Sequence, residues 1–166
     1  SRQDRDGQCE KQRDAVDEWV GGGGVLVVTD PISEFVPPAF QDFERVSDLG
    51  PAATLRGRCE IGALDQIDVS RVRPLHGGAL YDAPSSADTC LANAFGLAHI
   101  VVEDRGSGTV VALGGAGMLV NAALAEGNNA PVASALLATG QGTDLLVLEP
   151  GPLGSAGRGR GHFQHH

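Results

Sequence analysis

The sequence predicts a single mixed α/β domain, arranged as a layered α/β/α sandwich around a mostly parallel sheet with one antiparallel hairpin. The chain has 166 residues, of which 42% are hydrophobic, and this is enough for one domain with a buried core. Apolar runs typical of buried strands alternate with stretches of helical periodicity. Two further apolar runs flank a glycine-containing turn, which is typical of a hairpin.

The first element expected is a helix that begins at Glu10. Val16 and Val20 lie at helical spacing, whereas the charged residues between them fall on other faces. Glycines 21–24 end this helix, because glycine readily adopts the left-handed cap conformation. Residues 1–9 are polar and are expected to form a disordered leader, so that the domain spans residues 10–150.

Four strands and a helical turn are expected in the next part of the chain. Val25–Val28 is a continuous apolar run, which indicates a strand covered on both faces. The proline-rich stretch that follows predicts a loop, with a helical turn over Phe40–Val46. Shorter strands are expected at Thr54–Ile61, Val69–Pro74 and Ala79–Tyr81.

The hairpin is the clearest element of the second half. Its strands read LAHIVVED and TVVALG, and its turn is the segment 105–108. The segment 118–127 is expected to be a short helix or an ordered loop. Asn128 and Asn129, followed by Pro131, predict the start of a helix that ends at Gly140, because asparagine caps helices and proline suits the first turn.

The last strand is expected at Leu145–Leu148, and the glycine-rich segment 151–166 is expected to be a disordered tail.

The composition of the chain limits the classes of partner that it can bind. Asp and Glu outnumber Lys and Arg by 21 to 12, giving a net charge of −9, so the overall field repels nucleic acid and anionic lipid. No stretch approaches the ~20 apolar residues of a membrane-spanning helix, so direct membrane insertion by this sequence is not expected.

Three cysteines, Cys9, Cys59 and Cys90, match no zinc-binding spacing. Cys59 and Cys90 flank 30 residues rich in glycine and proline. A disulfide closing such a loop would contribute about 3–4 kcal/mol in the chain-entropy model. The alternative is two buried free thiols, since cysteine is among the most buried residue types.

The first candidate site is the turn after Val25–Val28, which contains Thr29, Asp30 and Ser33. Ligands and nucleophiles commonly lie at this end of a strand in open α/β sheets. Asp30 could act as a general base, a metal ligand or a phosphoryl acceptor. The structural alternative, which we favour, is a side chain that forms an Asx turn before Pro31.

The second candidate is the glycine turn formed by Gly114, Gly115 and Gly117. A strand, a glycine turn and then a helix is the arrangement that binds phosphate. However, no lysine follows as in a P-loop, and the dinucleotide-binding pattern is not met. A tight turn close to another backbone is the favoured alternative.

The histidines complete the candidate set. His76 lies in a glycine turn, and His99 lies in an apolar strand, where a hydrogen-bonded core histidine is the more common outcome. No nucleophile–histidine–acid arrangement can be assembled, so no catalytic residue, cofactor or metal site is predicted.

Two segments, EWVGGGGVLVVTDP and VVALGGAGMLVNAALAEGNNAPVASALL, resemble domain-of-unknown-function family 4350 of actinobacterial membrane proteins. The segment RGRCEIGAL, followed by a second cysteine, is also similar. The resemblance implies a glutamine-amidotransferase-like fold, usually set between membrane-spanning segments. Amidotransferases place a nucleophilic cysteine after the strand that is here Val25–Val28, and a histidine after a late strand. This chain has Thr29 and Asp30 at the first position and Gly114–Gly117 at the second.

The leading hypothesis is therefore a non-catalytic, extracytoplasmic binding or assembly domain of a bacterial membrane protein, with other cell-envelope or membrane components as partners. Its crevice would be formed by the two turns described above. The alternative hypothesis is a hydrolase or phosphate-ligand enzyme that uses Asp30 with His76 or His99. A third hypothesis is a domain that dimerises through a free sheet edge at the hairpin around Arg105.

Overall fold

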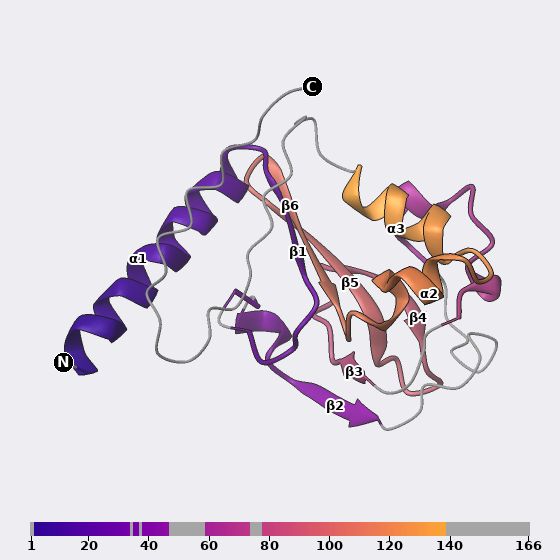
Figure 1. Ribbon diagram of the computed structural model, residues 1–166, viewed down its shortest axis with the longest axis horizontal. Helices are drawn as coiled ribbons and strands as arrows, with labels where there is room; N and C mark the ends of the chain where they lie inside the picture. Colours follow the sequence, from indigo (N-terminus) through magenta and orange to yellow (C-terminus); the bar gives the residue numbers. More distant parts are fainter. Residues whose placement is uncertain (1, 34, 37, 47–58, 74–77, 139–166) are drawn as a thin grey trace.

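The structure is a computed structural model, which describes residues 2–33, 35–36, 38–46, 59–73 and 78–138. It confirms the mixed α/β class: one open six-stranded sheet is accompanied by few helices. Helix α1 (Arg2–Gly21) lies on one side of the sheet, and α2 (Asn121–Leu124) and α3 (Asn129–Leu137) lie on the other (Figure 1).

The sheet is mostly antiparallel, so the prediction of a mostly parallel sheet is wrong. The strands are β1 (Val25–Val28), β2 (Phe43–Val46), β3 (Gly78–Tyr81), β4 (Asp88–Ala92), β5 (Ala98–Arg105) and β6 (Gly108–Leu113). Their order is β1-β6-β5-β3-β2, and β4 also pairs with β5. Among the described strand pairs only β1–β6 is parallel. The reason is connection length: β4, β5 and β6 follow one another through short turns, which can join only antiparallel neighbours.

The expected hairpin and the strand Val25–Val28 are confirmed, whereas several shorter elements differ. Residues 43–46 form β2 instead of a helical turn, and Val69–Arg71 forms a 3-10 helix (η4) instead of a strand. Strand β4 was not predicted. These differences concern elements of three to five residues, whose conformation depends on their neighbours in space more than on local pattern. The expected strand residues 54–58 and 145–148 and the tail 151–166 lie outside the described residues.

The helical elements also differ at their ends. Helix α1 begins at Arg2, not at Glu10; half of residues 2–9 are Arg or Gln, which are good helix formers. Its N-terminal end extends away from the sheet (Figure 1). Helix α3 ends at Leu137. The described residues also form the 3-10 helices η1 (Pro38–Phe40), η3 (Gly62–Leu64) and η5 (Gly117–Leu119).

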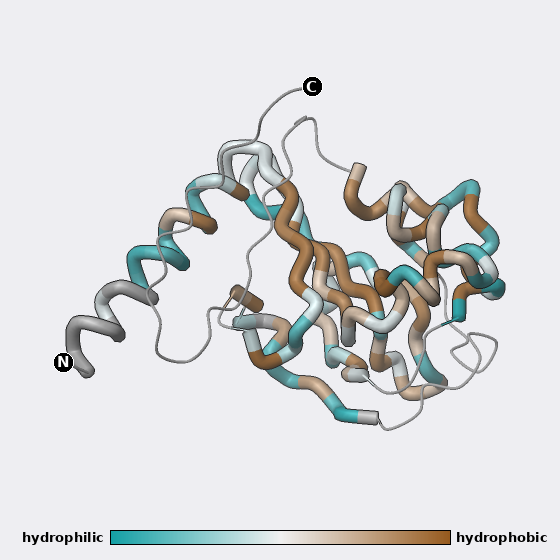
Figure 2. Tube along the Cα trace, in the orientation of Figure 1, coloured by the Kyte–Doolittle hydropathy of each residue, from teal (hydrophilic) through white to brown (hydrophobic). Residues whose placement is uncertain are grey.

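The sheet separates two hydrophobic clusters. Ile100 and Val102 of β5 belong to the cluster that also contains Val132 and Leu136 of α3. Val101 belongs to the other cluster, together with residues of α1 and η1. This alternation is the period-two pattern of a strand buried on both faces. The central strands are accordingly the most continuously hydrophobic part of the chain (Figure 2).

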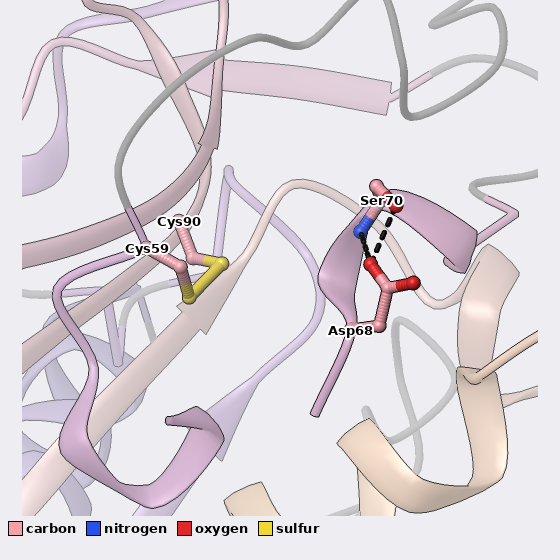
Figure 3. Close-up of a disulfide and its surroundings, with 4 residues drawn as sticks. All are labelled: Cys59, Asp68, Ser70 and Cys90. Carbon is pink, nitrogen blue, oxygen red and sulfur yellow. Dashed lines mark hydrogen bonds between the residues drawn. A yellow bond between two sulfur atoms is a disulfide. The ribbon is translucent and has the colours of Figure 1, made fainter. Parts of the chain in front are cut away.

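Cys59 and Cys90 form a disulfide, which decides between the two alternatives left open by the sequence (Figure 3). Cys90 lies in β4 and is fully buried, and the backbone N–H of Glu60 donates to the carbonyl oxygen of Thr89 at 2.9 Å. Close by, Ser70 donates from its backbone N–H and its hydroxyl to Asp68 Oδ1 at the start of η4 (Figure 3). The disulfide therefore ties the loop that carries η3 and η4 to the sheet.

Asn128 and Asn129 hold the same loop from the other end. They stand at the start of α3 as predicted, with Asn128 at the N-cap position, but neither side chain bonds the first turn of the helix, so the expected capping bond is absent. Instead Asn129, which is fully buried, accepts from the Arg73 N–H at 2.8 Å and donates to the carbonyl oxygens of Arg73 and Ala123 at 3.0 and 3.1 Å. Asn128 donates to the Asp68 carbonyl oxygen at 2.8 Å.

We expect Asn129→Ala to lower the free energy of unfolding by about 2–3 kcal/mol, because it removes three hydrogen bonds of a fully buried side chain and leaves the backbone N–H and carbonyl groups of Arg73 without these partners. Asn128→Ala is the matched control and should cost about 1 kcal/mol, since its single side-chain bond is exposed. Urea denaturation measures both. Equal losses for the two variants would contradict this assignment.

Candidate functional site

The carboxyl ends of β1 and β6 meet at one edge of the sheet. These strands are parallel, and Val28 is paired with Ala112. Two residues further along each chain segment stand Asp30 and Gly114, so the two turns that the sequence singled out are neighbours. The parallel pair places them together, although the rest of the sheet is antiparallel.

A cavity of about 270 Å³ lies at this edge, lined by Asp30, Pro31, Arg45, Gly78 and Gly114. It joins two predicted residues, Asp30 and Gly114, with two that were not predicted, Arg45 of β2 and Gly78 of β3. Of the other predicted crevice residues, Thr29, Ser33, Gly115 and Gly117 are not part of this lining. Arg45 could have been found only by recognising β2 as a strand that pairs with β3.

Asp30 forms the Asx turn that was the favoured alternative. Its Oδ1 accepts the backbone N–H of Ile32 at 3.1 Å, and its carbonyl oxygen accepts the N–H of Ser33 at 3.0 Å. The Ser33 hydroxyl in turn accepts the N–H of Phe35 at 3.3 Å. Both side chains therefore shape the loop after β1, while the exposed Asp30 carboxylate still borders the cavity.

Gly114 is the point where three strands meet. Its N–H donates to the His99 carbonyl oxygen at 2.8 Å, and its own carbonyl oxygen accepts the Ala79 N–H at 2.6 Å. A Cβ at this position would collide with the Ala79 carbonyl oxygen and would lie 2.5 Å from His99 Nδ1. Close backbone approach explains this glycine. The following helical elements, η5 and α2, have only three and four residues, too short to act as a phosphate-binding helix terminus.

The Tyr81 side chain bonds the last residue of β6. Its hydroxyl donates to the Leu113 carbonyl oxygen at 3.0 Å, and its side chain is fully buried. Burial, followed by the negative charge of Asp30, raises the pKa of Tyr81 to about 12. Tyr81 is therefore a neutral hydrogen-bond donor at physiological pH.

His99 is a core histidine. It is 2% exposed, and its Nδ1 lies 3.2 Å from the Ala79 carbonyl oxygen. Burial lowers the pKa of the imidazole from its ordinary value of 6.5, and the bond to Ala79 offsets this only in part. The structure does not join His99 to Asp30 by a hydrogen bond, and His76 lies outside the described residues.

Residues 5–137 match the model of a family described as a domain of unknown function, DUF4350. The chain belongs to this family. No curated protein and no solved structure matches it. Within the described part of this DUF4350 chain, no group of three or more His, Cys, Asp or Glu side chains could hold a metal ion. The helices of that part are also too short or too polar to cross a membrane.

The hairpin around Arg105 is not a sheet edge in the DUF4350 domain, so this part of the dimerisation hypothesis is wrong. β5 and β6 each have neighbours on both sides. The hairpin turn also packs against the end of α1: Arg105 forms an ion pair with Asp17 at 2.7 Å, and the Ser107 N–H donates to the Gly21 carbonyl oxygen at 3.0 Å. The helix therefore covers the turn that had been expected to be free.

We expect Gly114→Ala to destabilise the DUF4350 domain by about 3 kcal/mol, because the added methyl group forces β3 away from β6. Gly62→Ala is the control, since a Cβ at Gly62 meets nothing within 4 Å, and it should change stability by less than about 0.5 kcal/mol. Thermal and urea unfolding measure both effects. A neutral Gly114→Ala variant would show that the strands do not meet at this residue.

His99 should make stability depend on pH below about 6.5. The folded state excludes a proton that the unfolded state binds, so the free energy of unfolding falls as the pH drops from 6.5 towards the lowered pKa of His99. His99 changes the free energy of unfolding by at most about 1.4 kcal/mol per pH unit, and above about pH 6.5 this dependence disappears.

The measurement is urea denaturation from pH 7.5 to 5.0 for the wild type and His99→Gln. The stability difference between the two should narrow as the pH falls, because only the wild type excludes this proton. Two parallel curves, or an imidazole signal for His99 that titrates above 6.5 in NMR spectra, would contradict the assignment.

Proposed function

We propose that this DUF4350 domain is a non-catalytic, extracytoplasmic binding or assembly domain of a bacterial membrane protein. The observation that carries the proposal is the disulfide between Cys59 and Cys90. Disulfides persist in oxidising compartments and are rare where the thiol pool is kept reduced. A disulfide that ties a long loop to the sheet, with Cys90 fully buried, therefore favours a location outside the cytoplasm.

The geometry at the sheet edge supports a binding role over catalysis. If the fold is glutamine-amidotransferase-like, the nucleophile would stand in the turn after β1, and a histidine would follow a late strand. Here the turn after β1 holds Thr29 and Asp30, and the Asp30 side chain bonds its own loop. The residue after β6 is Gly114, where no side chain fits. The two positions that would hold the catalytic cysteine and histidine are thus occupied by residues that stabilise the fold, Asp30 in its turn and Gly114 between closely spaced strands.

The cavity remains usable by a ligand or by a loop of a partner. Its charged side chains come from separate parts of the sheet, Asp30 from the turn after β1 and Arg45 from β2. The expected partners are other cell-envelope or membrane components. The net charge of −9 disfavours nucleic acid as a partner.

The test is the redox state of Cys59 and Cys90 in cells of the source bacterium. Cells are quenched in acid, free thiols are alkylated, disulfides are reduced, and the released thiols receive a second label before peptide mapping. We expect both cysteines to carry the second label, while the thiols of a cytoplasmic marker protein carry the first. Free thiols at both positions in freshly quenched cells would overturn the proposal.

A further inference from the structure

We infer that the cavity between β1, β2 and β6 binds a small zwitterion, with its ammonium group at Asp30 and its carboxylate at Arg45. The inference rests on the binding role proposed above and adds the chemistry of the ligand. Its basis is that two opposite charges line one cavity of about 270 Å³ without pairing with each other.

The contacts of the two side chains show that both charges stay available. Asp30 accepts one backbone N–H, that of Ile32, through Oδ1. The Arg45 guanidinium carbon stands 5.9 Å from the centroid of the Phe43 ring. Neither side chain forms an ion pair in the described part of the chain, where Arg105 forms the ion pairs that the structure records.

Charge selects against simpler ligands. A lone anion drawn to Arg45 is opposed by Asp30 and by the net charge of −9, and a lone cation at Asp30 is opposed by Arg45. A molecule that carries both charges satisfies both groups at once. Arginine presents a planar fork of donors that matches the two oxygens of a carboxylate, and the carboxylate of Asp30 is a matching acceptor for an ammonium group.

Size and surroundings support a small molecule. Pockets for drug-sized ligands span about 300–1,000 Å³, so a cavity of about 270 Å³ fits a compact ligand. Two of the lining residues, Gly78 and Gly114, have no side chain, which leaves the space beside the two charged groups to the ligand.

The chain offers a second cavity as an internal comparison. It measures about 240 Å³ and is lined by Ser86, Asp88, Val102, Glu103 and Asp104. It is similar in size but acidic, with no cationic side chain in its lining. A zwitterion should not select it, so a carboxylate in this cavity provides a matched control variant.

The experiment is an NMR titration of the labelled chain with glycine, β-alanine, γ-aminobutyrate and 5-aminovalerate, in which the spacing between the two charges increases step by step. Butyrate and butylammonium carry one charge each. We expect saturable shifts of the Gly78 and Gly114 amides with at least one zwitterion. The singly charged compounds should bind about tenfold more weakly, because each forms one charged contact in place of two.

Asp30→Asn and Arg45→Gln should each lower the affinity for the tightest-binding zwitterion about tenfold. Asp88→Asn in the second cavity should leave that affinity unchanged. In the Asp30→Asn variant the amide oxygen of the new side chain can still accept the Ile32 N–H, so the turn after β1 is retained. The inference is overturned if no zwitterion shifts these amides, or if both cavity variants bind as the wild type does. An oxidised disulfide in cells combined with no zwitterion binding would remove this inference and leave the proposed function standing.

Discussion

The backbone of Gly114 is the constraint on which the rest of this structure depends. Through one donated and one accepted hydrogen bond it joins β6 to His99 of β5 and to Ala79 of β3. β3 then carries β2, and with it Arg45, to the edge where β1 ends at Val28. The cavity exists because these strands converge there. A side chain at residue 114 would separate them, which explains a glycine directly after the apolar strand β6.

Two sets of restraints hold this sheet from opposite sides. On one side the disulfide and the fully buried Asn129 fix the loop that carries η3 and η4 against the sheet and α3. On the other side the turn of the β5–β6 hairpin binds the end of α1 through Arg105 and Asp17. The edge with Asp30 and Gly114 lies outside both sets of contacts. A rigid framework with polar groups at one edge is what the proposed binding role requires.

Local pattern predicted the parts of the fold that are locally determined. The apolar run Val25–Val28 and the hairpin around residues 105–108 need only strand propensity and a glycine turn, and both are confirmed. β2 pairs with β3, which lies far along the chain, and β4 has only five residues, so pattern alone did not identify either strand. The same limit applies to the site: Asp30 and Gly114 follow apolar strands and could be proposed, whereas Arg45 reaches the edge only through the pairing of β2 with β3. Local sequence suggested that Asn129 caps a helix, because its actual partner, Arg73, is distant in the chain and cannot be identified from the neighbouring residues.

Amide hydrogen exchange resolved by NMR tests the convergence of strands at Gly114 most directly. The account predicts that the N–H groups of Gly114 and Ala79 exchange as slowly as those in the middle of β5 and β6, because both are bonded within the central sheet and open only with it. Fast exchange at Ala79 and Gly114, with β5 and β6 still protected, would show that β3 is not attached at this junction. The cavity shared by Asp30 and Arg45 would then not exist as described.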